Sequence, residues 1–260
     1  MKKTFAMLLA ILLICSCFAG CGNMASDSDL AYIQDKGKMI VGITDYEPMD
    51  YKDENGNWTG FDAEFAQLVC KELGVECEFF VLADWGKKFY ELETKNVDAV
   101  WNGMTITEEA LLNASVSDPY VVNAQVVVMK ADMVANYTDA ESMKDLTIAV
   151  ENGSAGQDAA ASIGATNIVA VADQAAALME VAAGTADACV IDITMANAMT
   201  GEGTSYADLA AGISLTSEEY GIAFRKDSDV TAKVNEIMAK LIADGTLQAL
   251  ADKYSLTLAK

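Results

Sequence analysis

The sequence contains no histidine among its 260 residues. This absence excludes a Ser-His-Asp or Cys-His catalytic arrangement and any metal site with histidine ligands. Basic residues are also scarce, with 17 Lys and Arg against 39 Asp and Glu, which gives a formal net charge of −22. A field of this sign repels phosphate groups, so the sequence predicts no nucleic-acid partner.

The signature motifs of several large enzyme classes are absent as well. There is no Walker A, GxSxG or zinc-ligand motif, and GEGTSY at 201–206 lacks the last glycine of the dinucleotide-binding GxGxxG pattern. DENGNW at 53–58 fits an Asn-Gly hairpin turn better than a calcium-binding loop. We therefore predict a protein that is not an enzyme and has no catalytic residue, metal or cofactor.

The N-terminus has the features of an export signal. Lys2 and Lys3 precede an apolar run at 5–18 that is too short to cross a membrane comfortably. The run is followed by Ala19-Gly20-Cys21, which resembles the lipobox of bacterial lipoproteins. On this interpretation, residues 1–20 are a signal peptide. Residues 21–35 comprise Cys21, which is lipidated with palmitate, and a tether to the folded protein. The protein would then be anchored on the outside of the cell membrane. The alternative is ordinary secretory cleavage, with no role for Cys21.

After the tether, short apolar strands alternate with helices in two series. The strand and helix candidates are MIVGI (39–43), FDAEFAQLVCKEL (61–73), CEFFV (77–81) and DAVW (98–101), then LTIAV (146–150), NIVAV (167–171), DQAAALMEVAAG (173–184) and ACVI (188–191). Such alternation predicts an α/β fold, in which mostly parallel sheets are flanked by helices.

The two series resemble each other, because the interval from Glu91 to Asp98 equals that from Glu180 to Asp187. We therefore predict two lobes of similar topology. Lobe 1 comprises residues 36–122 plus 224–260, since the helices at 230–254 return to it, and lobe 2 comprises 123–223. Two hinge strands, near 122–126 and 219–223, would join them. Ligands of open α/β sheets bind beyond the carboxyl ends of strands, so WNGMT (101–105), ENGSAG (151–156) and Asp192 should face one cleft.

Several segments in order resemble the extracytoplasmic solute-binding proteins of ABC importers, in the polar amino acid branch known as bacterial solute-binding protein family 3. The resemblance spans roughly residues 36–256 and rests on VGITDYEPMDYKDENGNWTGFDAEFA, DAVWNGMTITEE, SDPY, IAVENGSAG, DACVID, YGIAFRKD and ADGTLQALADKY. It implies a two-lobed periplasmic-binding-protein-like fold of type II. It also implies a monomer that captures a small polar solute, an amino acid or amine-bearing relative. Hinge closure then delivers the solute to the permease subunits of an ABC importer.

The resemblance also implies site residues. Tyr46 and Trp85 would sandwich the ligand's side chain, and Asp192 would grip its α-amino group. The residues expected to contact or flank the carboxylate are Asn102, Gly103 and Thr105 from the first lobe, and Ser154 and Ala155 from the second. Asp45 lies near the predicted cleft and adds to its acidic character. Cys70 and Cys77 match a disulfide of some basic-amino-acid binders, whereas Cys189 looks like a buried packing residue.

One departure from the family bears on the ligand. Ala110 stands where the family has an arginine that clamps the α-carboxylate, and the loss of that pair forfeits a strong charge-assisted interaction. Three hypotheses follow. In the first, Lys87 or Lys88 supplies the positive charge. In the second, the ligand is a cationic amino acid, amine or short peptide that is recognised by acidic residues such as Glu151. In the third, the ligand is another small polar solute.

Two other functional classes fit the same fold. A sensor module would bind the same ligand and report to a separate membrane receptor. A dehydratase-like enzyme would use Asp192 or Glu151 as a buried acid or base.

Overall fold

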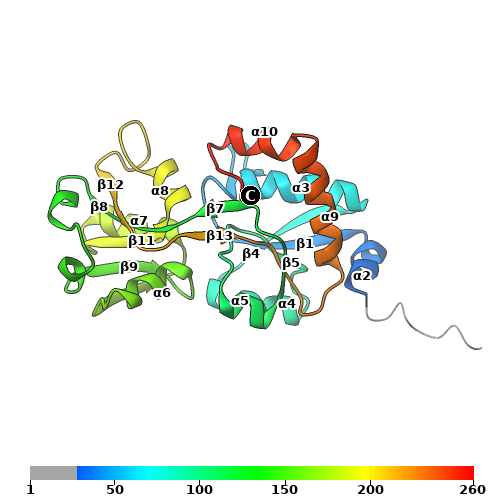
Figure 1. The fold of residues 1–260 in the computed structure, drawn as a ribbon, viewed down its shortest axis with the longest axis horizontal. Coiled ribbons are helices and arrows are strands. Elements are labelled where there is room, and N and C mark those ends of the chain that lie inside the picture. The colour runs from blue at the N-terminus through cyan, green and yellow to red at the C-terminus, as the bar shows by residue number, and fades with distance from the viewer. Residues whose placement is uncertain (1–27) are drawn as a thin grey trace, which may run out of the picture.

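The computed structural model describes residues 28–260, which form two α/β lobes joined by a pair of strands (Figure 1). The predicted signal peptide and Cys21 lie outside these residues. Within the described chain, every helix is too short or too polar to cross a membrane.

The first lobe is built on a five-stranded sheet of order β4-β1-β5-β14-β6. Strand β1 pairs in parallel with β4 and β5, while β14 runs antiparallel to β5 and β6. Three helices cover one face of the sheet and two shorter helices cover the other (Figure 1). The strands are β1 (Lys38–Ile43), β4 (Glu76–Val81), β5 (Ala99–Val100), β6 (Ser115–Val116) and β14 (Ala223–Phe224); the helices are α3 (Phe61–Leu73), α9 (Val230–Ala243) and α10 (Thr246–Lys253), then α4 (Lys88–Glu93) and α5 (Glu108–Asn113).

The second lobe repeats this plan with the order β10-β9-β11-β8-β12. Strand β9 pairs in parallel with β10 and β11, and β8 is antiparallel to β11 and β12. The antiparallel half of each sheet is a detail that strand–helix alternation did not predict. The elements are β8 (Gln125–Lys130), β9 (Thr147–Glu151), β10 (Asn167–Val171), β11 (Ala188–Asp192) and β12 (Leu209–Ser214), with α6 (Ala155–Ser162) on one face and α7 (Gln174–Ala183) and α8 (Ile193–Met199) on the other.

The lobes are connected by β7 (Val121–Asn123) and β13 (Glu218–Tyr220), which pair antiparallel between the two sheets (Figure 1). The C-terminal residues run beside β7, where Val122 N donates to Thr257 O and Ala259 N to Tyr120 O. The smaller elements are the hairpin β2 (Tyr51–Lys52) and β3 (Trp58–Thr59), and the 3₁₀ helices η1 (Trp85–Lys87), η2 (Val134–Asn136) and η3 (Glu141–Met143).

Helix α3 shows how sequence pattern sets an element. Phe61, Phe65 and Val69 recur at helical spacing and all are buried. Gly74 ends the helix with φ 74°, and its N–H bonds the carbonyls of Cys70 and Lys71. The predicted helix over 61–73 is confirmed.

Cys70, Cys77 and Cys189 are free thiols in the structure. Cys77 lies on β4 opposite Met39. A hydrogen bond with Cys70, followed by burial, raises the pKa of the Cys77 thiol. The two thiols are therefore neighbours, and their oxidation to a disulfide stays a prediction. Cys189 is fully buried in β11, as its apolar surroundings in the sequence predict.

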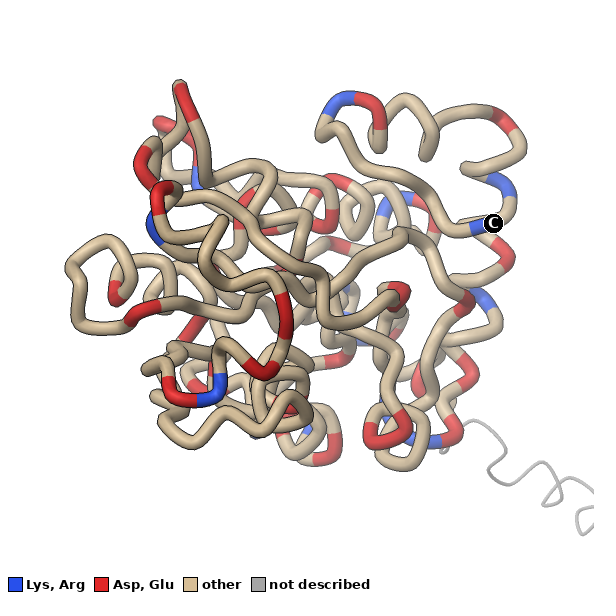
Figure 2. Tube along the Cα trace, turned by 60° about the vertical axis from the view of Figure 1, so that its left-hand side comes forward, with Lys and Arg blue, Asp and Glu red and all other residues tan. Residues whose placement is uncertain are grey.

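Acidic residues are spread over both lobes, with basic residues scattered among them (Figure 2). No strongly basic face interrupts them in this view of the described chain. The distribution agrees with the formal charge of −22.

The prediction that the tether extends to residue 35 is wrong, because α2 (Asp29–Lys36) packs on the first lobe. Ser28 caps the helix by accepting a bond from Ala31 N, and Ile33 is fully buried. Side-chain packing and capping therefore order a segment whose composition alone suggested a linker.

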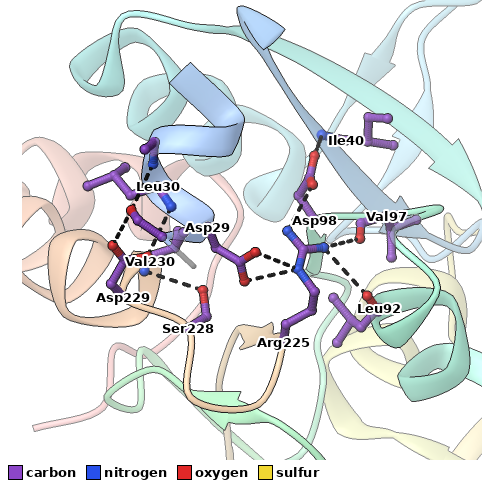
Figure 3. A network of polar contacts seen from close by, with 12 residues as sticks. Asp29, Leu30, Ile40, Leu92, Val97, Asp98, Arg225, Ser228, Asp229 and Val230 are labelled. Carbon is purple, nitrogen blue, oxygen red and sulfur yellow. Dashed lines mark hydrogen bonds and ion pairs between the residues drawn. The ribbon is translucent and has the colours of Figure 1, made fainter. Parts of the chain in front are cut away.

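An ion cluster centred on Arg225 fastens α2 to the sheet (Figure 3). Arg225 Nε lies 2.9 Å from both carboxylate oxygens of Asp29, and its Nη2 lies 3.2 Å from Asp98 Oδ1. The Arg225 side chain is 9% exposed and that of Asp98 is 0% exposed. The guanidinium also donates to the carbonyl of Val97, so its buried charge is well satisfied.

Arg225→Met should lower the free energy of unfolding by about 3 kcal/mol, because Asp29 loses its bidentate partner and the fully buried Asp98 keeps only Lys36 of its two cationic partners. Urea denaturation measures the change. The matched control is Lys240→Met, which removes an exposed pair with Glu72 and should cost less than about 1 kcal/mol. Equal losses in the two variants would contradict a structural role for the cluster.

Candidate functional site

A cleft lies between the lobes, at the facing ends of their strands. It is lined by nearly all of the residues that the sequence predicted, from both lobes. These are Tyr46, Trp85, Lys88, Asn102, Gly103, Thr105, Ser154, Ala155 and Asp192.

The loop after β5 is shaped by Gly103, whose φ is 55°. A Cβ at this position would lie 2.5 Å from Tyr46 Cε1, so only glycine allows the tyrosine ring to pack on the loop. Gly103 N donates to the buried Asp62 Oδ2 at 2.6 Å. Burial raises the pKa of the Asp62 carboxyl to about 7. The Gly103 N–H is therefore already hydrogen-bonded within the protein.

Asn102 is likewise committed to internal contacts. Its Oδ1 accepts bonds from the N–H and hydroxyl of Thr44, and its Nδ2 donates to Asp50 Oδ2 at 2.8 Å. Asn102 and Gly103 therefore flank the cleft and position its loop.

Two aromatic side chains form the apolar part of the cleft. Trp85 begins η1 and Tyr46 precedes the hairpin, and both are buried. The Tyr46 hydroxyl lies 2.5 Å from Thr194 Oγ1 and 2.5 Å from the Tyr220 hydroxyl. Tyr46 thus joins the first lobe to α8 of the second lobe and to the hinge strand β13.

Asp192 lies at the carboxyl end of β11 and is 3% exposed. Its Oδ1 accepts bonds from Asn123 Nδ2 and from Gln125 Nε2, and its Oδ2 accepts one from Gln174 Nε2. Burial, with the nearby Glu218 carboxylate, raises the pKa of Asp192 to about 6. The amide donors oppose this shift, so the carboxyl is mainly ionised at pH 7.

The same amides connect Asp192 to the hinge. Glu218, on β13, accepts bonds at Oε1 from Asn123 Nδ2 at 2.7 Å and from Gln125 Nε2 at 2.6 Å. Thr105 Oγ1 donates to this oxygen at 2.9 Å. We call Asn123, Gln125, Asp192 and Glu218 the hinge carboxylate cluster, because two amides bridge two carboxylates between the site and β13.

Of the two candidate cations, Lys88 alone lies in the cleft. It is 6% exposed, and its Nζ donates to Gly153 O of the second lobe at 3.1 Å. The ammonium also lies 5.0 Å from the centre of the Trp85 ring. Burial lowers the Lys88 pKa, while Glu109 and Glu151 oppose that shift. Ala110 is buried in the same apolar cluster as Trp85.

Two predicted site residues are corrected by the structure. Asp45 is exposed and does not line the cleft. Lys87 has a side chain that is 66% exposed, and it pairs with Asp84 at 3.3 Å. Asp45 and Lys87 each adjoin a residue that does line the cleft, Tyr46 and Lys88 respectively, but their own side chains lie outside it.

Sequence reasoning gave no individual role to several lining residues: Met104, Thr107, Glu109, Gln125, Gly153, Asp158 and Gln174. Met104 and Gly153 do lie in the two loops that were predicted to face the cleft, and Glu151 was considered as an acidic residue and as a buried acid or base. Glu109 and Asp158 lie in the first turns of α5 and α6, and helix N-termini at a cleft were an available signal. Gln125 and Gln174 belong to no motif, so only their contacts with Asp192 identify them.

The lobes touch each other across the mouth of the cleft. Asn152 Nδ2 donates to Asp84 Oδ1 at 3.0 Å, beside the Lys88–Gly153 bond. Gly86 and Gly153 meet back to back, since a Cβ on Gly153 would lie 2.5 Å from Gly86 Cα. The structure is therefore a closed arrangement, in which backbone and short polar side chains of the two lobes meet at one side of the mouth.

Two α/β lobes, paired hinge strands and a polar interlobe cleft define a periplasmic binding protein of type II. The sequence comparison gives the family. A model of bacterial extracellular solute-binding proteins, family 3, matches residues 39–257, and the chain belongs to this family. The predicted fold class and family are confirmed.

Individual relatives agree with this assignment. The arginine-binding extracellular protein ArtP of Bacillus subtilis (strain 168) is 32% identical over 267 residues, covering 98% of each chain. A mutant of ArgBP from T. maritima has a TM-score of 0.81 and 32% identity, covering 87% of this chain and 98% of its own. The ancestral amino acid-binding protein AncCDT-1, a precursor of cyclohexadienyl dehydratase, has a TM-score of 0.80 and 32% identity over 87% of this chain and 99% of its own.

Gly153→Ala should destabilise the closed arrangement by about 1–3 kcal/mol, because the new methyl group overlaps Gly86 only when the lobes meet. Small-angle scattering should give a larger radius of gyration than for the unsubstituted protein. Gly184→Ala is the matched control, since Gly184 also has positive φ but no atom within 4 Å of an added Cβ. An unchanged radius for Gly153→Ala would contradict this contact as a determinant of closure.

Proposed function

We propose that this protein captures an amino acid, or a close amine-bearing relative, in the interlobe cleft and presents it to the permease of an ABC importer. The observation that carries the proposal is one buried cation, Lys88, and one buried, mainly ionised carboxylate, Asp192, lining the same cleft. A zwitterion has the complementary pair of charges. Each buried charge of the protein gains a partner when such a ligand binds.

Asp192 is the proposed partner of the ligand's α-ammonium. Three amide donors hold its carboxylate in one orientation, and an ammonium can add a charge-assisted hydrogen bond. The carboxylate is thus oriented before the ligand arrives, which reduces the entropy cost of binding.

Lys88 is the proposed partner of the carboxylate, in place of the arginine that Ala110 replaces. Its ammonium bonds Gly153 O, directly before Ser154, the N-cap of α6. A helix N-terminus carries a partial positive charge that favours an anion. Lys88, Ser154 and Ala155 together therefore offer positive charge from both lobes.

Trp85 and Tyr46 are the proposed walls for the ligand's side chain, since aromatic faces pack well on aliphatic stems and attract cations. Thr105 flanks the carboxylate and is held by Glu218. The proposed lobes, residues 36–122 plus 224–260 and residues 123–223, would close about β7 and β13. A ligand that bridges both lobes favours the closed form, which would dock on the permease.

The proposal includes anchoring through a lipid on Cys21, a monomeric state, and binding without chemical turnover. The lipobox-like sequence supports the anchor. The relatives described above are named as binding proteins, which supports binding without turnover.

The test of the function is calorimetric titration with the standard amino acids, polyamines and neutral sugars. We expect micromolar or tighter binding of one or more amino acids and none of sugars. Asp192→Asn should weaken that binding by roughly 10- to 100-fold. Affinity should also fall below pH 6, because protonation of Asp192 removes the charge that pairs with the ammonium. Absence of binding by every amino acid and amine would overturn the proposal.

Lys88→Met should weaken amino acid binding by roughly 10- to 100-fold through loss of the carboxylate partner. Lys87→Met is the matched control and should change affinity less than about twofold, since its exposed pair with Asp84 contributes little. Decarboxylated ligands such as agmatine distinguish the role of Lys88. Their affinity should fall much less in Lys88→Met, and an equal fall would show that Lys88 acts on closure alone.

A further inference from the structure

Glu151 is a buried carboxyl in the cleft for which the proposed function, so far, has no use. It lies at the carboxyl end of β9, is 3% exposed and lines the cleft. Among residues 28–260, no group hydrogen-bonds its Oε1. Buried carboxyl oxygens nearly always have a partner, so an unpartnered one aimed into a ligand cleft requires an explanation.

The surroundings of Glu151 explain why the fold does not satisfy it. The charged groups that act on it are the Asp192 and Asp173 carboxylates, which repel a negative charge, and the Lys88 ammonium, which attracts one. The Gln174 amide also favours the ionised form, but it is shared with Asp192. Burial, followed by these carboxylates, raises the pKa of Glu151 well above its ordinary value. Glu151 therefore loses its proton readily only when an additional positive group lies nearby.

The charge balance of the cleft points the same way. Glu109, Glu151, Asp158 and Asp192 line it, whereas Lys88 is the one cation among the described lining residues. Glu109 and Asp158 are exposed to water at the mouth, but Glu151 and Asp192 are buried. A neutral amino acid brings one positive and one negative group, which match Asp192 and Lys88 and leave Glu151 without a partner. A ligand with a second cationic group can satisfy all three.

We propose that Glu151 is a ligand-binding residue that receives a cationic group of the ligand's side chain, so that the protein selects basic over neutral amino acids. This inference rests on the proposed function, because it assumes that Asp192 and Lys88 hold the α-ammonium and the α-carboxylate. Trp85 and Tyr46 line the same cleft, and their faces suit the aliphatic stem of a basic side chain.

The test compares ligands of the same shape but different charge. Bound ligand is first removed from the mature protein by unfolding and refolding. Arginine and citrulline are then titrated into it separately and their affinities compared, as are lysine and norleucine. We expect each basic ligand to bind at least roughly tenfold more tightly than its neutral counterpart, the magnitude of one hydrogen bond between charged groups. In Glu151→Gln this ratio should fall to within about threefold of one.

Two further measurements separate recognition from a structural role. Asp45→Asn removes a nearby carboxylate that does not line the cleft, and it should keep the arginine-to-citrulline ratio. Arginine binding by the unsubstituted protein should release protons, seen as a dependence of the binding enthalpy on the buffer, and Glu151→Gln should release fewer. The melting temperature of Glu151→Gln without ligand should equal or exceed that of the unsubstituted protein, since a poorly satisfied carboxyl is removed.

The outcomes are distinguishable. Binding of neutral and basic amino acids with equal affinity overturns the inference and leaves the proposed function standing. A ratio that survives in Glu151→Gln, or an equal loss of arginine and citrulline affinity, also overturns the role of Glu151 in side-chain recognition. Failure of every amino acid and amine to bind overturns the proposed function, and this inference with it.

Discussion

The bridge between Asp192 and Glu218 is the interaction on which the site depends. The carboxylates of buried Asp192 and half-buried Glu218 are held close together, and the amides of Asn123 and Gln125 donate to both of them. Because Asn123 and Glu218 belong to the paired hinge strands, the orientation of Asp192 depends on the geometry of the hinge. Thr105 donates to Glu218 from the first lobe, so the loop after β5 is tied to the same point. Ligand recognition and lobe orientation therefore share one hydrogen-bond network.

The closed arrangement combines this network with contacts at the opposite side of the cleft. Tyr46 reaches Thr194 and Tyr220 near the hinge, while Lys88 reaches Gly153 at the mouth. Each contact joins polar groups that water can satisfy equally well when the lobes separate, so each stabilises the closed form only modestly. The balance between open and closed forms is then set by what lies between the lobes, as a capture protein requires.

The sequence predicted much of the fold because its signals are local. Apolar spacing and Gly74 define α3, and Gly245 separates α9 from α10. The site was predicted less completely, because adjacent residues differ in direction. Tyr46 faces the cleft whereas Asp45 faces water, and Lys88 is buried whereas Lys87 is exposed. Neighbours in an extended segment point to opposite sides, and neighbours in a helix are rotated by about 100°. The unsatisfied oxygen of Glu151 depends on contacts from α7 and β11, which no local pattern reveals.

Helix α2 is bound by Arg225 at the outer end of the first lobe, away from the second lobe (Figures 1 and 3). The described chain therefore begins on the first lobe. With the proposed attachment at Cys21, a force from the lipid anchor would act on the first lobe. The second lobe would then be free to rotate about the hinge during ligand binding and release.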